Sequence, residues 1–278
     1  MGNMTLGELQ QYGLPLAFDE DAQAFIDELD TLTLAEQTAI DDLVRGLKYY
    51  GLWDKMIAIY PMIGGAYLTH RYNLKDPRLL DAAFRISFTG GWTHSSTGAT
   101  PNGTTSYGNT HIIPNDDLTD NSASLGYYSR TNSAFTDEYV MGVSDQGGIS
   151  TLSLIARRDT DLGGFWAEGS SVAYRNAKNL SITNGQGFFQ GSQSGSVAGF
   201  RRNTLITFNT DVGLNQGANT HDLFIGCWNN YTAGTDLAES FTDKECAFAY
   251  VGNTLSTEES RDYYDIVQRY QIALNRDV

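Results

Sequence analysis

Aromatic side chains next to amides are the residues of this sequence best suited to binding a ligand. Trp92 and His94 occur in the run Trp-Thr-His, and Trp228, Asn229 and Tyr231 occur in the run Trp-Asn-Asn-Tyr. A sugar stacks an apolar face on an aromatic ring and hydrogen-bonds its hydroxyl groups to amides. These five residues therefore indicate a carbohydrate-binding site. The alternative is that each tryptophan anchors the hydrophobic core.

The carboxylates of the central region do not form a convincing acid/base pair. A polysaccharide hydrolase needs two carboxylates on either side of one bond. Asp137 and Glu138 are adjacent and would point to opposite faces of a strand. The acids at 159 and 161 stand in a turn-like sequence, and those at 243 and 245 flank a lysine. We therefore expect no enzymatic activity and no catalytic residue.

Other catalytic and metal-binding motifs are missing from the sequence. The stretch Gly191–Gly195 resembles a nucleophile elbow but has Gln193 where the nucleophile belongs. The four histidines, at 70, 94, 111 and 221, do not have metal-ligand spacing, and no Walker loop occurs. The oxygen-rich run 115–121 lacks an EF-hand pattern, so we expect a solvated loop, with a Ca²⁺ site as the alternative. We expect no metal and no cofactor.

Composition limits the partners of this chain. Its 278 residues carry 33 acidic and 18 basic side chains, a net charge of −15. This charge disfavours nucleic acid and anionic membrane surfaces. No apolar run reaches the roughly 20 residues that span a bilayer, so we expect no membrane insertion, and we find no secretory signal. Cys227 and Cys246 are expected to be buried free thiols, with a disulfide between them as the alternative.

The first part of the chain is acidic and has helical periodicity. Residues 1–60 contain 11 acids and 3 bases, which we interpret as a solvated helix face, with a docking surface for a basic partner as the alternative. Helical spacing of apolar residues predicts a helix over 19–29. Thr33 and Glu36 form a capping box that starts a second helix, which ends near Gly51. Trp53, Met56, Ile57 and Tyr60 predict a third short helix.

The pattern of the region from about 66 to 252 predicts short strands bounded by Gly, Asn, Asp and Ser. With no long helix between them, these strands favour an antiparallel β-sandwich over a parallel sheet. The clearest are 83–89, 125–130, 138–143, 151–157, 187–193, 196–200, 205–209, 223–229 and 246–251.

A final helix over 256–276 completes the predicted organisation. Ser256 and Glu259 form a capping box, and an apolar stripe follows that would pack on the sandwich. The chain is therefore divided into an anchor or flexible terminus (1–18), an acidic helical segment (19–65) and a β-sandwich with its C-terminal helix (66–278). The fold class is mainly β.

The order of several segments resembles a recurrent module of structural proteins in tailed bacteriophages. The resemblance covers about residues 34–278, and its final "strand, Gly, short linker, helix" arrangement is similar to that of concanavalin A-like phage domains. The matching segments are Trp53–Met56, Tyr60–Gly65, Asn73–Arg78, Leu80–Arg85, Thr89–Gly98, Pro101–Gly103, Tyr127–Thr131, Cys246–Gly252, Leu255–Ser256 and Ala273–Arg276.

The resemblance implies a concanavalin A-like jelly roll, of the lectin/glucanase type, located in the virion as a tail, fibre or capsid-surface component. Its implied partners are other virion proteins, further copies of the chain in a homo-oligomer such as a trimer, and host surface glycans. Since this fold also hosts enzymes and inert spacers, function does not follow from fold. The alternatives are a polysaccharide-degrading enzyme and a cellular carbohydrate-binding module.

Overall fold

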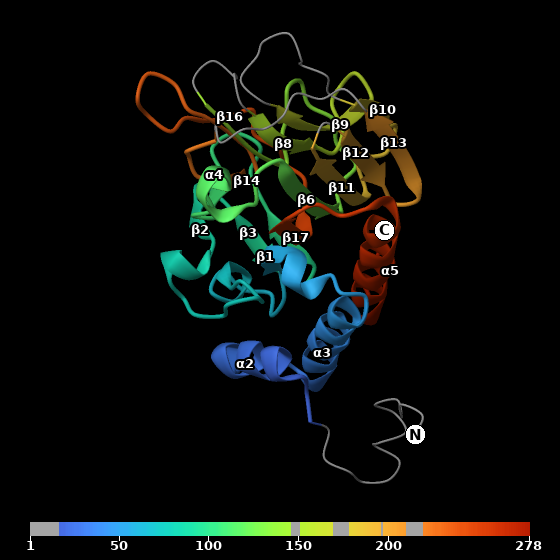
Figure 1. The fold of residues 1–278 in the computed structure, drawn as a ribbon. Coiled ribbons are helices and arrows are strands. Elements are labelled where there is room, and N and C mark those ends of the chain that lie inside the picture. Colours follow the sequence, from blue (N-terminus) through green and yellow to red (C-terminus); the bar gives the residue numbers. More distant parts are fainter. Residues whose placement is uncertain (1–16, 146–150, 169–177, 196, 210–218) are drawn as a thin grey trace.

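A layer of helices lies against one of two stacked β-sheets in the computed structural model (Figure 1). The structure describes residues 17–278 except for 146–150, 169–177, 196 and 210–218. The mainly β sandwich with a C-terminal helix that the sequence predicts is confirmed. Residues 1–16 of the predicted terminal segment 1–18 lie outside the described residues.

The first sheet has eight strands in the described residues and carries the helices on its outer face. Its strand order is β13-β12-β11-β6-β17-β4-β3, and β1 also pairs with β17. All of these pairings are antiparallel. The strands are β1 (Met56–Tyr60), β3 (Thr93–Ser95), β4 (Gly98–Thr100), β6 (Ser122–Ser129), β11 (Gly187–Ser194), β12 (Val197–Arg202), β13 (Leu205–Asn209) and β17 (Cys246–Gly252).

The second sheet has nine strands in the described residues, in the order β10-β9-β8-β7-β14-β5-β2. Strand β15 pairs parallel with β7 and antiparallel with β16. The strands are β2 (Ser87–Thr89), β5 (Tyr107–Asn109), β7 (Met141–Ser144), β8 (Thr151–Ile155), β9 (Leu162–Glu168), β10 (Lys178–Ser181), β14 (Phe224–Ile225), β15 (Trp228–Asn230) and β16 (Ala238–Glu239).

The three long helices begin where the sequence places their caps. They are α2 (Glu20–Leu29), α3 (Leu34–Tyr49) and α5 (Thr257–Ala273). Asp19 caps α2, and both predicted capping boxes, at Thr33 and at Ser256, are present. A short helix α4 (Pro114–Asp117) and three 3₁₀ turns, η1 (Trp53–Lys55), η2 (Thr69–Arg71) and η3 (Asp81–Ala83), lie in the connections.

Two hydrophobic cores hold these layers together. One lies between the sheets, and the other lies between the first sheet and the helices. Neighbouring residues of β11 show the division, because Phe189 belongs to the inner core and Phe188 to the helix-side core. Helix α5 contributes Tyr263, Val267 and Tyr270 to the helix-side core.

The predicted third helix is wrong. Residues 56–60 form β1, which pairs with β17 and extends the first sheet into the segment that was assigned to helices. Four of its five residues are buried, because β1 faces a core on each side. A strand with both faces covered lacks the polar alternation that marks half-exposed strands, and its apolar run also fits helical spacing.

Three predicted strands are shorter or split. The strand predicted at 223–229 breaks into β14 and β15 at Gly226, whose φ of 89° turns the chain. The strand predicted at 83–89 begins only at Ser87, since η3 and Phe84, with a φ of 57°, precede it. Glu138 precedes β7 instead of lying in it.

Cys227 and Cys246 are buried and free, as predicted. None of the described helices has the length and apolar character to cross a bilayer.

Candidate functional site

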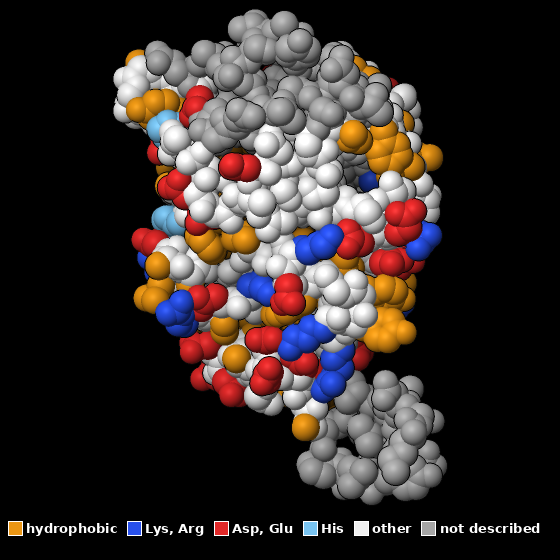
Figure 2. Space-filling view, viewed as in Figure 1, with side chains coloured by type: hydrophobic (Ala, Val, Ile, Leu, Met, Phe, Trp, Pro, Cys, Tyr) orange, Lys and Arg blue, Asp and Glu red, His pale blue; other side chains and the backbone are white. Residues whose placement is uncertain are grey.

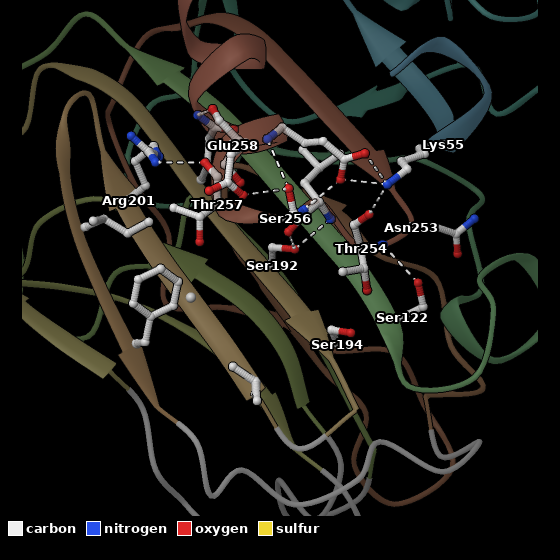
Figure 3. Close-up of a pocket in the computed structure, with 18 residues that line it drawn as sticks. Lys55, Ser122, Ser192, Ser194, Arg201, Asn253, Thr254, Ser256, Thr257 and Glu258 are labelled. Carbon is white, nitrogen blue, oxygen red and sulfur yellow. Dashed lines mark hydrogen bonds and ion pairs between the residues drawn. The ribbon is translucent and has the colours of Figure 1, made fainter. Parts of the chain in front are cut away.

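A groove of about 590 Å³ lies on the outer face of the first sheet, beside the start of α5 (Figure 3). Strands β11, β12 and β13 form its floor, and the link from β17 into α5 forms its wall. The lining residues are Lys55, Ser122, Gln190, Ser192, Ser194, Val197, Gly199, Arg201, Ile206, Phe208, Asn253, Thr254, Leu255, Ser256, Thr257, Glu258, Glu259 and Ser260.

The floor follows from strand alternation. Gln190, Ser192 and Ser194 project outward from β11, while their neighbours face the inner core. The helix-side core includes no residue of β12 or β13, and Val197 and Phe208 are 40% and 43% exposed. Figure 2 shows hydrophobic side chains exposed at the upper right, over this end of the sheet. The floor is therefore polar near α5 and apolar towards β13.

Phe208 lies across Gly199, its register partner on β12. A Cβ added to this glycine would be 3.0 Å from Cε1 of the ring. The missing side chain therefore lets the phenyl ring lie close to the strand, while 43% of the residue stays accessible. An aromatic ring held in this way offers a flat apolar surface to a ligand.

Hydrogen bonds fix the wall to the floor. Ser192 Oγ donates to the carbonyl of Leu255 and accepts from its N–H, both at 2.9 Å. Gln190 Nε2 donates to the carbonyl of Ser260 at 3.0 Å. Figure 3 shows Ser192 of β11 beside the link that leads through Thr254 and Ser256 into α5. The groove is therefore built on rigid elements.

The charged groups of the groove have hydrogen-bond partners within the protein. Lys55 Nζ lies 2.6 Å from both carboxylate oxygens of Glu259. Partial burial would raise the pKa of Glu259, but the hydrogen bonds from Lys55 and Ser256, together with the Lys55 charge, lower that pKa. Arg201 is buried and donates to the carbonyls of Asn203 and Thr257, at 3.3 and 3.2 Å. The lining therefore combines hydroxyl and amide side chains with an exposed phenyl ring and other apolar surface.

Two of the five predicted site residues, Trp92 and His94, lie away from the groove and contact each other. The Trp92 ring packs against the inner core, and its Nε1 donates to the carbonyl of Tyr107 at 3.2 Å. The Nδ1 atoms of His94 and His70 are 3.0 Å apart. Burial lowers the pKa of both histidines, to about 3 for His70. Trp92 and His94 therefore take part mainly in side-chain packing within the sandwich.

The other three, Trp228, Asn229 and Tyr231, form a second group at β15. The Trp228 ring stacks on Tyr139 with centroids 5.0 Å apart. Asn229 is buried and donates to the carbonyl of Asp222 and to Asp236. The ring of Tyr231 stacks on His221. The structure therefore divides the predicted residues into two groups, and none of the five lines the groove.

Sequence reasoning missed the groove residues, above all Phe208 and the serines of β11. The alternation Gln190, Ser192, Ser194 along a predicted strand signals a polar outer face. Ser192 and Ser194 also belong to the stretch Gly191–Gly195, which resembles a nucleophile elbow. The contribution of α5, more than 50 residues further along the chain, has no such signal.

The other predicted carboxylates and metal candidates take part in local pairs. Asp161 pairs with Arg157 at 2.7 Å, and Glu245 with Arg130 at 3.2 Å. Asp117, in the oxygen-rich run 115–121, accepts from the backbone of Ile113. Within the described residues, no three His, Cys, Asp or Glu side chains are grouped to hold a metal ion.

Comparison with solved structures finds domains similar in fold to this chain. One is a structure of botulinum neurotoxin type C, a toxin whose cell entry depends on interaction with two ganglioside molecules. It matches 79% of this chain with a TM-score of 0.51 and 8% sequence identity. Domain 4 of AbnA, an extracellular arabinanase from Geobacillus stearothermophilus, matches 77% of this chain with a TM-score of 0.46 and 17% sequence identity. NanB sialidase from Streptococcus pneumoniae matches 62% of this chain with a TM-score of 0.45 and 13% sequence identity.

These matches cover different shares of the known proteins. The chain spans 53% of the toxin chain and 27% of the NanB chain, but 98% of the AbnA domain. No protein-family model matches the sequence, and no curated protein does.

Proposed function

We propose that this chain is a non-enzymatic glycan-binding protein of a bacteriophage virion, and that the groove beside α5 is its glycan site. The observation that carries the proposal is the exposed ring of Phe208, held over Gly199 in a groove that the hydroxyl groups of Ser194 and Thr257 also line. A sugar ring needs this combination of a stacking surface and hydrogen-bonding groups.

The two carboxylates that line the groove, Glu258 and Glu259, support binding without hydrolysis. They are neighbours on one helix, and Glu259 is bound by Lys55. Glycosidases hold their two carboxylates on opposite sides of the scissile bond, about 5 to 9.5 Å apart. The pair in this groove is unsuited to that arrangement.

The virion location rests on the resemblance of residues 34–278 to structural proteins of tailed bacteriophages. A tail, fibre or capsid-surface component of this kind would assemble with other virion proteins and with copies of itself, for example as a trimer, and would adsorb to host surface glycans. The ganglioside interaction of a toxin with a similar sandwich fold is compatible with glycan binding on this scaffold.

A glycan array with the purified full chain tests the proposal. We expect binding to a discrete set of bacterial surface saccharides, with no release of reducing ends on prolonged incubation. Phe208→Ala should weaken binding about tenfold, the loss of roughly 1.4 kcal/mol expected for one stacking ring. Phe135→Ala is the matched control, because Phe135 is similarly exposed, at 41%, but lies outside the groove.

Three results would overturn the proposal. Hydrolysis of a bound saccharide would show an enzyme. Equal affinity of the Phe208→Ala and Phe135→Ala variants would place the site elsewhere. Light scattering that shows a monomer, together with the absence of the chain from purified particles, would favour a cellular carbohydrate-binding module.

A further inference from the structure

Glu138 and Lys244 form an ion pair in which both side chains are fully buried. Glu138 precedes β7 of the second sheet, and Lys244 precedes β17 of the first. The pair therefore joins the two sheets through side chains that water does not reach. Such a pair is costly to bury as ions, since each charge loses its hydration.

Polar groups surround this pair on both sides. Lys244 Nζ hydrogen-bonds to Oε1 of Glu138 and lies 3.2 Å from Ser133 Oγ. Thr242 Oγ1 donates to the other carboxylate oxygen, Oε2, at 3.0 Å. Ser133 Oγ donates in turn to a carboxylate oxygen of Asp243. The amine thus contacts both the carboxyl group and a hydroxyl bound to a second carboxylate.

Burial favours the uncharged form of both partners. Desolvation raises the pKa of Glu138 to about 7 and lowers the pKa of Lys244. Transfer of one proton from the ammonium to the carboxylate gives a neutral amine beside a neutral carboxylic acid. These are the protonation states in which an amine is a nucleophile and a carboxyl group can lose its hydroxyl.

We propose that Lys244 and Glu138 condense into an intramolecular isopeptide bond between the two sheets. The lone pair of Nζ attacks Cδ of Glu138, so the Nζ–Cδ bond forms. The Cδ–Oε1 bond then breaks, and a proton from Nζ joins the departing hydroxyl, which leaves as water. One N–H remains on the amide, and the step needs no oxidant, reductant or cofactor.

The neighbouring hydroxyls have defined roles in this step. Thr242 donates to Oε2, the oxygen that becomes the amide carbonyl, and so stabilises the negative charge that develops on it during attack. The proton that leaves Nζ passes to the departing Oε1, which Nζ contacts directly, while Ser133, bonded to Asp243, accepts a hydrogen bond from Nζ and orients the amine. The product is neutral, so the two sheets are joined without buried charge.

The Lys55–Glu259 pair is the natural internal control. Its side chains are 35% and 28% exposed, so water solvates both charges. It has the same two residue types in hydrogen-bond contact, but it lacks the burial that favours neutral partners. We therefore expect condensation at Glu138–Lys244 and none at Lys55–Glu259.

Mass spectrometry of the purified full chain under denaturing conditions tests the proposal. We expect the intact chain to be lighter than its sequence by one water, about 18 Da. Trypsin should then leave Lys244 uncut and release peptide 131–157 joined to peptide 203–261. Full sequence mass, or cleavage after Lys244 with both peptides free, would overturn the proposal.

Single variants locate the bond. Glu138→Ala and Lys244→Met should each restore the full mass of the substituted chain, whereas Lys55→Met should retain the deficit. A deficit that persists in either of the first two variants would overturn the assignment. The joined peptides of the unsubstituted chain decide the question even where a variant fails to fold.

Discussion

Two aromatic regions of this molecule use their rings in opposite ways. Around Trp92 and Trp228, each ring is covered by another side chain: Phe88 contacts Trp92, and Tyr139 stacks on Trp228. On β13, Phe208 lies on a glycine and leaves much of its surface free. The difference shows that the size of an aromatic side chain is a poor guide to binding, because large rings are the first to be used for packing.

The exposure of Phe208 follows from where the helices end. Helices α3 and α5 pack on the outer face of the first sheet, and the core between them includes residues of β17, β6 and β11 but none of β12 or β13. Side chains under the helices form a core, whereas those beyond them line a groove. The predictions below test this contrast, beginning with the largest expected effect.

Trp92→Ala should lower the free energy of unfolding by about 3 kcal/mol, because the ring packs on the inner core and fills the space beside Gly226. Urea denaturation measures the change. Glycan affinity of the folded fraction should stay the same. A variant of normal stability that no longer binds would reverse the contrast between the two regions.

Acid should weaken the Trp92 region through His70. Its pKa falls from 6.5 to about 3 on folding, since burial disfavours the charged ring. The folded state therefore binds this proton less readily than the unfolded chain. The contribution of neutral His70 to the stability of the folded state is complete above pH 6.5 and is lost as the pH falls towards 3. The slope is about 1.4 kcal/mol per pH unit for one group.

Unfolding curves at several pH values measure this effect. The difference between the unsubstituted chain and His70→Leu isolates it from the carboxylates, which also titrate in acid. A difference that does not change between pH 6 and pH 4 would show that His70 titrates as if it were exposed.

Gly199→Ala should weaken glycan binding several-fold and change stability by less than about 0.5 kcal/mol. The new Cβ would lie 3.0 Å from the Phe208 ring and displace it, and the exposed ring can move without disturbing the core. Isothermal titration with a saccharide found on the array measures the affinity. A fall in stability of several kcal/mol instead would mean that the ring belongs to the packed structure.

Phe208→Ala should have the smallest effect on stability, less than about 0.5 kcal/mol, because the ring is already 43% exposed. Thermal unfolding of this variant beside Trp92→Ala compares the two aromatic regions directly. A large loss of stability at Phe208 would remove the distinction between packing rings and binding rings.

Local signals in the sequence predicted much of the fold. The capping boxes at Thr33 and Ser256 place two helix starts, and the strand at 205–209 has the predicted limits. Strand β1 was missed because a strand covered on both faces shows no alternation. Gly226 splits a predicted strand because backbone conformation, and not side-chain pattern, decides that turn.

The candidate site was less accessible to sequence reasoning. Trp228 and Asn229 have the residue types of a sugar site, yet contacts with Tyr139 and Asp236 occupy them, and both partners lie in other segments. The groove unites Ser192, Phe208 and Thr257 from three elements. Only the tertiary arrangement, which leaves β12 and β13 beyond the helices, shows that these residues meet.

Amide chemical-shift mapping tests the location of the site most directly. The isotope-labelled chain is titrated with a saccharide that it binds on the array. The account predicts that the shifts concentrate at residues that line the groove: Ser192, Ser194, Gly199, Arg201, Ile206, Phe208 and Thr254–Glu258. Shifts centred on Trp92 and His94, or on Trp228 and Tyr231, with an unchanged groove, would contradict it.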